Sequence, residues 1–268
     1  MSNVREPAFA GTFYPAQKEL LSRGIEDYLK DITPEKNETA PKALIVPHAG
    51  YMYSGAVAAA AYSCLAGRAK EIKRVVLLGP AHQCSMRGLA YSNADYFHTP
   101  MGDVPVDLDA IHLISSMKQV SLNAQAHALE HSLEVQLPFL QSILNDFKIV
   151  PLVVGEALAT EVSDVIDKLW GGPETLIVVS SDLSHYLPYD RAQRVDEFTI
   201  NKILSLLSLD TYHQACGAIP INGLLLSVRR HQLQPKLLKL CNSGDTAGDK
   251  KMVVGYCAIS FSGEDVHG

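Results

Sequence analysis

The chain has 268 residues, of which 47% are hydrophobic and 19% charged, so it can bury a substantial core and is not disordered, collagen-like or a coiled coil. Its 29 acidic and 23 basic residues give a net charge of −6, and no run of Lys or Arg exceeds two residues, so we expect no nucleic-acid partner. Because the sequence has neither a membrane-length apolar stretch nor a hydrophobic signal core, we expect a cytoplasmic protein with no membrane partner.

Short β-branched runs alternate with longer helical patterns, which predicts an α/β fold with a mainly parallel or mixed sheet between layers of helices. Strands are predicted at 43–47, 74–79, 148–154, 175–181, 236–241 and 252–261. Helices are predicted at about 54–65, 108–118, 131–145, 159–169, 190–207 and 221–230. Each strand is apolar nearly throughout, as burial on both faces requires. The first helix is predicted to begin at Ser54, whose hydroxyl can cap it.

No linker or internal repeat divides the sequence, which predicts one domain over residues 1–268, with 263–268 as a flexible tail. The segment 86–106 is predicted to be an antiparallel excursion or a long active-site loop. The five cysteines include no CxxC pair, so neither a disulfide framework nor a zinc ribbon is indicated. One of them, Cys216, precedes Gly217 in a turn that leads into a helix.

Polar side chains follow several predicted strands at the end where open α/β sheets bind ligands. His48 follows the first strand, His82 the second, and Asp245 the fifth. Two imidazoles and one carboxylate suit non-heme Fe(II), and zinc accepts the same ligands. The sequence therefore predicts a divalent metal site of His48, His82 and Asp245, with Fe(II) preferred and copper or zinc as alternatives.

The third ligand has a competitor close by in the sequence. Asp245 is a hard oxygen donor in a glycine-containing loop, whereas Cys241 is a soft sulfur donor four residues earlier. Since Cys241 is still within the predicted strand, we prefer Asp245 and interpret Cys241 as a core thiol.

Asp182 and His185 follow the fourth strand and lie three residues apart. Such a carboxylate can hold an imidazole in one tautomer and make it a general acid or base, so these two residues are the predicted catalytic pair. The alternative is structural: Asp182 would cap the helix near Pro188 or close a turn at Ser184.

The segment His127-Ala-Leu-Glu130-His131 matches the H-x-x-E-H pattern of inverted zinc peptidases and suggests a zinc hydrolase. It also matches a loop that enters an amphipathic helix. On that preferred interpretation, Glu130, His131 and Glu134 cap the helix or hydrogen-bond to the metal ligands without binding the metal themselves.

Nine stretches that include these residues resemble the Memo family, also called Memo-like or AmmeMemoRadiSam system protein B, and they occur in order along nearly the whole chain. They are AFAGTFYP (8–15), PHAGYMYSG (47–55), LLGPAHQ (77–83), HTPMGDVPVD (98–107), EHSLEVQLPFL (130–140), VPLVVG (150–155), SSDLSHY (180–186), CGAIPI (216–221) and NSGDTAGDKKMVVGYCA (242–258).

The resemblance implies a fold like that of LigB-type class III extradiol dioxygenases, with His48 and His82 as metal ligands and Asp182 and His185 beside the metal. Animal members have a cysteine in the last loop, where this chain has Ser243-Gly244-Asp245, so Asp245 is the nearest equivalent. Many prokaryotic members are encoded beside AMMECR-type and radical SAM proteins, which makes those proteins expected partners.

Two main hypotheses of function follow. The first is a metalloprotein with a dioxygenase-like pocket, a possible oxidoreductase that acts on an unknown small molecule. The second is a binding protein that uses the inherited pocket to capture a peptide without turnover, since the family has no settled activity. The zinc hydrolase centred on His127 and His131 is a third.

Overall fold

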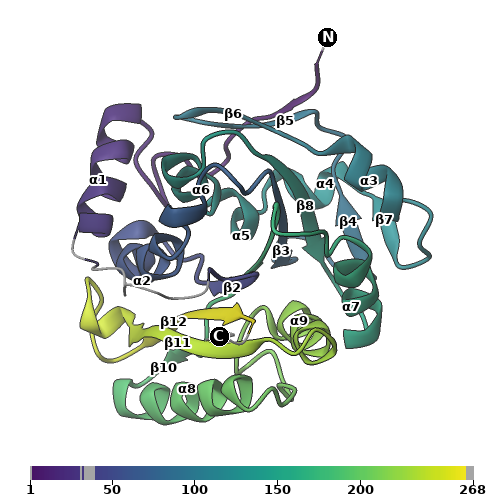
Figure 1. Ribbon diagram of the computed structural model, residues 1–268. Helices are drawn as coiled ribbons and strands as arrows, with labels where there is room; N and C mark the ends of the chain where they lie inside the picture. The colour runs from purple at the N-terminus through teal and green to yellow at the C-terminus, as the bar shows by residue number, and fades with distance from the viewer. Residues whose placement is uncertain (1, 31, 33–39, 264–268) are drawn as a thin grey trace, which may run out of the picture.

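A mixed sheet of nine strands runs through the described part of the computed structural model, which comprises residues 2–30, 32 and 40–263 (Figure 1). The strand order is β10-β12-β2-β9-β3-β8-β4-β7, and β11 pairs with the other edge of β12. The strands are β2 (Ala43–Val46), β3 (Arg74–Pro80), β4 (Leu89–Tyr91), β7 (Val120–Leu122), β8 (Lys148–Val154), β9 (Thr175–Ser180), β10 (His185–Leu187), β11 (Gln234–Asn242) and β12 (Val253–Ser262).

Four central strands, β2, β9, β3 and β8, are parallel, while β12 runs antiparallel to β2 and β4 runs antiparallel to β8. The predicted α/β class with a mixed sheet is therefore confirmed. Because parallel strands end at the same edge, the segments after β2, β3 and β9 meet there, and this is where the polar residues of the sequence motifs lie.

Helices lie on both sides of the central strands (Figure 1). They are α1 (Lys18–Lys30), α2 (Tyr51–Ser63), α3 (Leu108–Ile114), α4 (Ala124–Ala128), α5 (His131–Glu134), α6 (Leu137–Ile143), α7 (Ala159–Lys168), α8 (Tyr189–Leu204) and α9 (Ala218–Arg230), with short 3-10 helices at Ala66–Arg68 and Ser243–Asp245. None of the helices in the described ranges is both long and apolar enough to cross a membrane.

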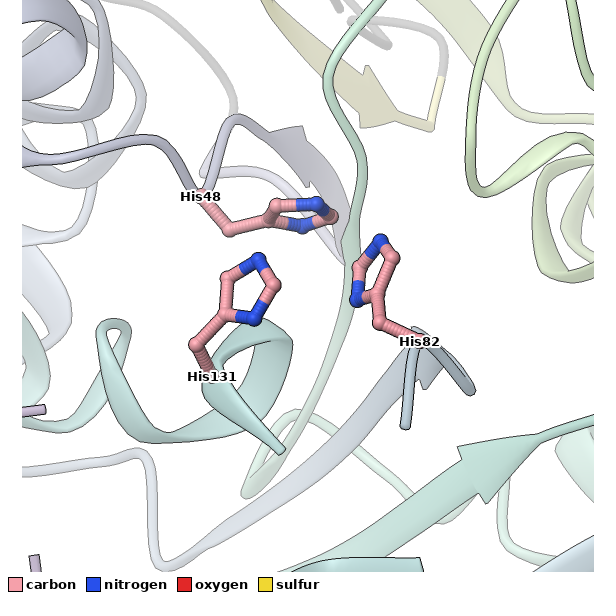
Figure 2. A group of neighbouring side chains, drawn as sticks. All are labelled: His48, His82 and His131. Carbon is pink, nitrogen blue, oxygen red and sulfur yellow. The ribbon is translucent and has the colours of Figure 1, made fainter. Parts of the chain in front are cut away.

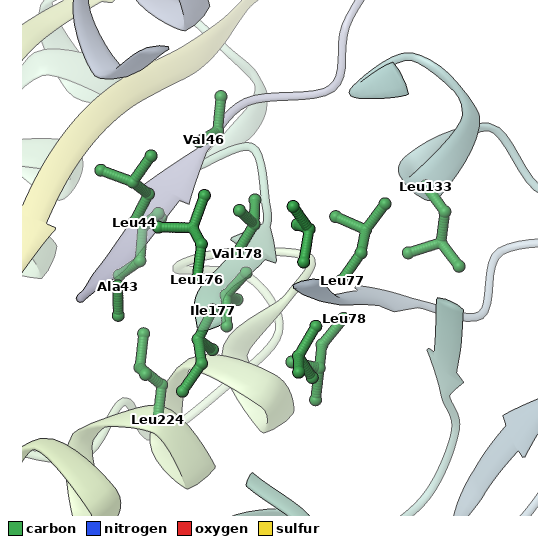
Figure 3. Close-up of a cluster of buried hydrophobic side chains, with 14 of the residues drawn as sticks. Ala43, Leu44, Val46, Leu77, Leu78, Leu133, Leu176, Ile177, Val178 and Leu224 are labelled. Carbon is green, nitrogen blue, oxygen red and sulfur yellow. The ribbon is translucent and has the colours of Figure 1, made fainter. Parts of the chain in front are cut away.

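The core lies between the central strands and these helices. Leu77, Ile177 and Val178 have no exposed surface. Figure 3 shows Leu133 of α5 on one side of the strands and Leu224 of α9 on the other. Burying such a side chain contributes about 1.5–3 kcal/mol, which explains why the strands are apolar on both faces.

Several predicted element boundaries differ from the structure. Helix α2 begins at Tyr51 after Gly50, and the Ser54 hydroxyl donates to the Ala49 carbonyl instead of capping the helix. The predicted helix 131–145 is divided at Val135 and Gln136 into α5 and α6, and Pro138 lies in the first turn of α6, where its missing N–H does no harm. Helix α1 was not predicted.

The segment 86–106 contains β4 and an antiparallel hairpin of β5 (Tyr96–Thr99) and β6 (Gly102–Pro105), in agreement with the predicted excursion. This hairpin forms a second sheet with β1 (Val4–Arg5). Of the predicted tail 263–268, residues 264–268 lie outside the described residues.

Candidate metal centre

Three imidazoles converge at the carboxyl edge of the parallel strands. His48 follows β2, His82 follows β3, and His131 is the first residue of α5. One ring nitrogen of each lies within 4.8 Å of one ring nitrogen of each of the others. Figure 2 shows the rings facing a common centre, and their centroids are 4.4–5.2 Å apart. This is an arrangement that could hold a metal ion.

The tautomer of His48 follows from its neighbours. Its Nδ1 lies 2.9 Å from Ser180 Oγ, which donates its single proton to the Ser132 carbonyl at 2.6 Å and accepts from Gln136 Nε2 at 2.8 Å. Ser180 can therefore only accept from His48, so Nδ1 carries the proton. The lone pair of His48 is consequently on Nε2.

The tautomer of His82 is set by Glu130. One Glu130 oxygen lies 2.8 Å from His82 Nδ1, and the other accepts from the His82 backbone N–H at 2.7 Å. Although burial opposes it, hydrogen bonds from His82 and the Ser132 backbone lower the pKa of Glu130 to about 2, so this group is a carboxylate. His82 Nδ1 therefore donates and Nε2 carries the lone pair, as in the carboxylate–histidine pairs of metal sites.

His131 is held by packing. Phe9 and Phe13 lie against its ring at centroid distances of 5.3 and 4.8 Å. Its Nδ1 is buried with no hydrogen-bond partner among the described residues. Burial, followed by the neighbouring His48 and His82, lowers the pKa of His131 to about 4.

Burial also lowers the pKa of His48 well below its ordinary value, with the neighbouring His82 as the next cause. His48 and His131 are therefore neutral near pH 7, and a neutral imidazole is the form that binds metals.

Asp245 lies apart from these three imidazoles. It is exposed in the 3-10 helix after β11, where its carboxylate accepts from the Asn242 backbone N–H at 3.0 Å and from the Tyr189 hydroxyl. The tight turn folds this carboxylate back onto its own loop. Cys241, the alternative, lies in β11 and is also outside the group. The third side chain that the structure brings to His48 and His82 is His131, which the sequence placed only in a supporting role.

Asp182 and His185 both lie near the three imidazoles, but Asp182 does not orient His185. The buried Asp182 carboxylate accepts from the His48 backbone N–H at 2.8 Å, and so holds the segment that carries His48. His185 Nδ1 lies 2.8 Å from the Leu183 carbonyl, which can only accept. Leu183 therefore sets the tautomer of His185 and leaves the lone pair on Nε2.

The H-x-x-E-H segment does not form a single helix. Helix α4 ends at Ala128 and α5 begins at His131, so the two histidines do not share one helical face. His127 is buried, and its Nε2 hydrogen-bonds to the Ala90 carbonyl at 2.9 Å. The motif thus contains His131, which lies in the three-imidazole group, and Glu130, which hydrogen-bonds to His82, in a geometry that differs from that of a zinc peptidase. Ser180 and Gln136, which set the His48 tautomer, lie within two of the matching stretches, but nothing in their local sequence indicates this role.

Comparisons with known proteins identify the family. A family model described as Memo-like protein matches residues 5–260. The chain belongs to the Memo-like family. A MEMO1 family protein of Aquifex aeolicus is 37% identical over 270 residues, covering 96% of this chain and 99% of the relative. One of Sulfurisphaera tokodaii is 34% identical over 283 residues, with the same coverage. The Memo resemblance found in the sequence is thus confirmed.

A solved structure supports the fold of this Memo-like chain. The uncharacterized protein JW3007 of Escherichia coli K12 is similar with a TM-score of 0.54 and 15% identity, covering 81% of this chain and 98% of that one. At this identity the likeness bears on the fold alone.

A buried carboxylate supports the loop that carries Asp182 and His185. Asp196 of α8 accepts from the Ser184 backbone N–H at 3.0 Å and is 2% exposed. Gly255 makes room for it, since a Cβ there would lie 2.0 Å from Asp196 Oδ2. Burial raises the pKa of Asp196 from 3.8 to about 6.

Replacing Asp196 with Asn is expected to stabilise the protein at pH 7 by about 1–3 kcal/mol. Between pH 4 and pH 6 the folded state keeps a proton on the Asp196 carboxyl that the unfolded state has lost. The contribution of Asp196 to the free energy of unfolding therefore falls as pH rises through this window. Urea unfolding at pH 4 and pH 7 measures the effect, which should vanish at the lower pH. The exposed Asp190→Asn of the same helix is the control, and equal changes at both pH values would contradict the prediction.

Proposed function

We propose that this protein is a non-heme metalloprotein in which His48, His82 and His131 bind one Fe(II) ion. The observation that carries the proposal is the convergence of three imidazoles. Neighbouring groups leave the lone pairs of His48 and His82 on Nε2. Neutral imidazole suits iron, copper and zinc alike, so the choice of Fe(II) rests on the family's likeness to non-heme iron enzymes.

The residues around the centre suit a small-molecule substrate. Bound Fe(II) would supply Lewis-acid and redox chemistry at coordination positions that three protein ligands leave free. His185, whose Nε2 has a free lone pair, would take a proton from the substrate and return it. Phe9 and Phe13 cover His131 on one side and exclude water there.

Metal analysis of the anaerobically purified protein tests the proposal. We expect close to one equivalent of iron after loading with Fe(II), and a loss of that iron when the three histidines are replaced together by alanine. The other histidines in the described part of the chain need no replacement, because they lie outside the group. Equal metal content in the wild type and the triple variant would overturn the proposal.

The Glu130→Gln variant is expected to bind metal about 10–100-fold more weakly, the usual effect of losing the partner that orients a ligand. Gln can accept a hydrogen bond from His82 Nδ1 but lacks the charge that makes the imidazole a better donor. Competition with a chelator of known affinity measures the change. The exposed Glu197→Gln serves as control, and unchanged affinity in Glu130→Gln would refute the role of this carboxylate.

A further inference from the structure

One thiol faces the candidate centre. Cys216 lies two residues before α9, and its Sγ is 3.2 Å from His48 Nε2. That nitrogen carries the lone pair, as the hydrogen bonds of Ser180 show. The Cys216 S–H therefore donates to the same lone pair that a metal ion would use.

The separation of these two atoms is close to that of two ligands on one ion. Zn–S and Zn–N bonds of about 2.3 and 2.0 Å at a tetrahedral angle place sulfur and nitrogen about 3.5 Å apart. The three-imidazole group does not include Cys216, so ligation requires its side chain to turn toward the centre. Rotation about the Cα–Cβ bond provides this movement.

Without a metal ion the sulfur is a protonated thiol, because burial and then the neighbouring Asp182 carboxylate raise the pKa of Cys216 to about 12. The Asp182 backbone N–H donates to Sγ at 3.3 Å, and the Ser181 hydroxyl lies 3.8 Å away. Cys216 also precedes the first turn of α9, a helix of 13 residues whose N-terminal end favours negative charge.

We propose that Cys216 is a fourth ligand of the metal held by His48, His82 and His131. When the ion binds, the S–H bond breaks, the proton passes to solvent, and a sulfur lone pair forms the metal–sulfur bond without any change in oxidation state. The inference rests on the proposed metal site. It adds a soft donor, which favours iron, zinc and copper(I) over manganese and magnesium.

Cobalt(II) titration of the full chain tests this ligand, because a thiolate bound to Co(II) produces a charge-transfer band in the near ultraviolet that imidazoles do not. We expect the band in the wild type and in Cys241→Ser, the matched control. It should be absent from Cys216→Ser, which keeps a hydroxyl donor for His48 and still binds cobalt, about 10–100-fold more weakly.

The outcomes separate the two proposals. The role of Cys216 is overturned if the wild type binds cobalt without a thiolate band. It is also overturned if the band is lost in Cys241→Ser but kept in Cys216→Ser. Both results leave the histidine site intact. If the wild type binds neither cobalt nor iron, the proposed metal site itself fails. The alkylation rate of Cys216 can also be measured in the wild-type protein, with and without zinc. If zinc leaves this rate unchanged, Cys216 is not a ligand of the metal.

Discussion

Replacing His82 with alanine is expected to weaken binding of Fe(II) or Zn(II) by about 100-fold. Four-ligand zinc sites are worth about 10–16 kcal/mol, so one ligand contributes roughly 3 kcal/mol, which is about two orders of magnitude in affinity. His48→Ala should have a similar effect, since its ring faces the same centre (Figure 2). Chelator competition under anaerobic conditions gives the affinities directly.

Two further histidine variants serve as controls. His98 is partly exposed and pairs with Asp103 in the β5–β6 hairpin, so His98→Ala should leave metal affinity unchanged. His127→Ala separates the present proposal from a zinc hydrolase of the H-x-x-E-H type. The hydrolase requires this histidine as a ligand, whereas the observed geometry places it outside the group. Loss of metal in His127→Ala, with binding retained in His82→Ala, would reverse our assignment.

Replacing Glu134 with alanine is expected to destabilise the protein by about 3–5 kcal/mol, the usual effect of removing one partner of a buried ion pair. Glu134 has no exposed surface and pairs with the buried Arg5. Its carboxylate also accepts from the backbone N–H groups of Ala8 and Phe9 and from the Tyr14 hydroxyl, at 2.6–2.9 Å. One carboxylate thus ties the N-terminal segment to α5.

Urea unfolding measures this loss. Asp146→Ala, which breaks the exposed pair with Lys73, is the control and should change stability by less than about 1 kcal/mol. Because Phe9 also packs on His131, we expect Glu134→Ala to weaken metal binding as well. A loss of stability no greater than that of the control would show that the N-terminal segment is held by its other contacts.

Sequence reasoning was most accurate where one local pattern decides the structure. The central strands could be predicted because burial on both faces requires a continuous apolar run, as in β3 and β9. His48 and His82 could be predicted as neighbours because they follow strands that are parallel and separated only by β9.

Asp245 shows what a local pattern does not predict. In the structure its carboxylate accepts hydrogen bonds from the Asn242 backbone N–H and from the Tyr189 hydroxyl, and it lies outside the three-imidazole group. Tyr189 is 56 residues away in the chain, so the local pattern around Asp245 contains no information about this contact.

By itself, the sequence determined the α/β class, the Memo-like family and two of the three imidazoles of the candidate centre. Those features depend on local apolar runs and on motifs whose residues are close together in the chain. Only the tertiary structure decided that His131 completes the group and that Ser180 sets the His48 tautomer. It also decided that Cys216, 168 residues from His48, faces the same nitrogen. Each of these contacts joins segments that are far apart in sequence, and only the packing of α5 and the loop before α9 against the sheet brings them together.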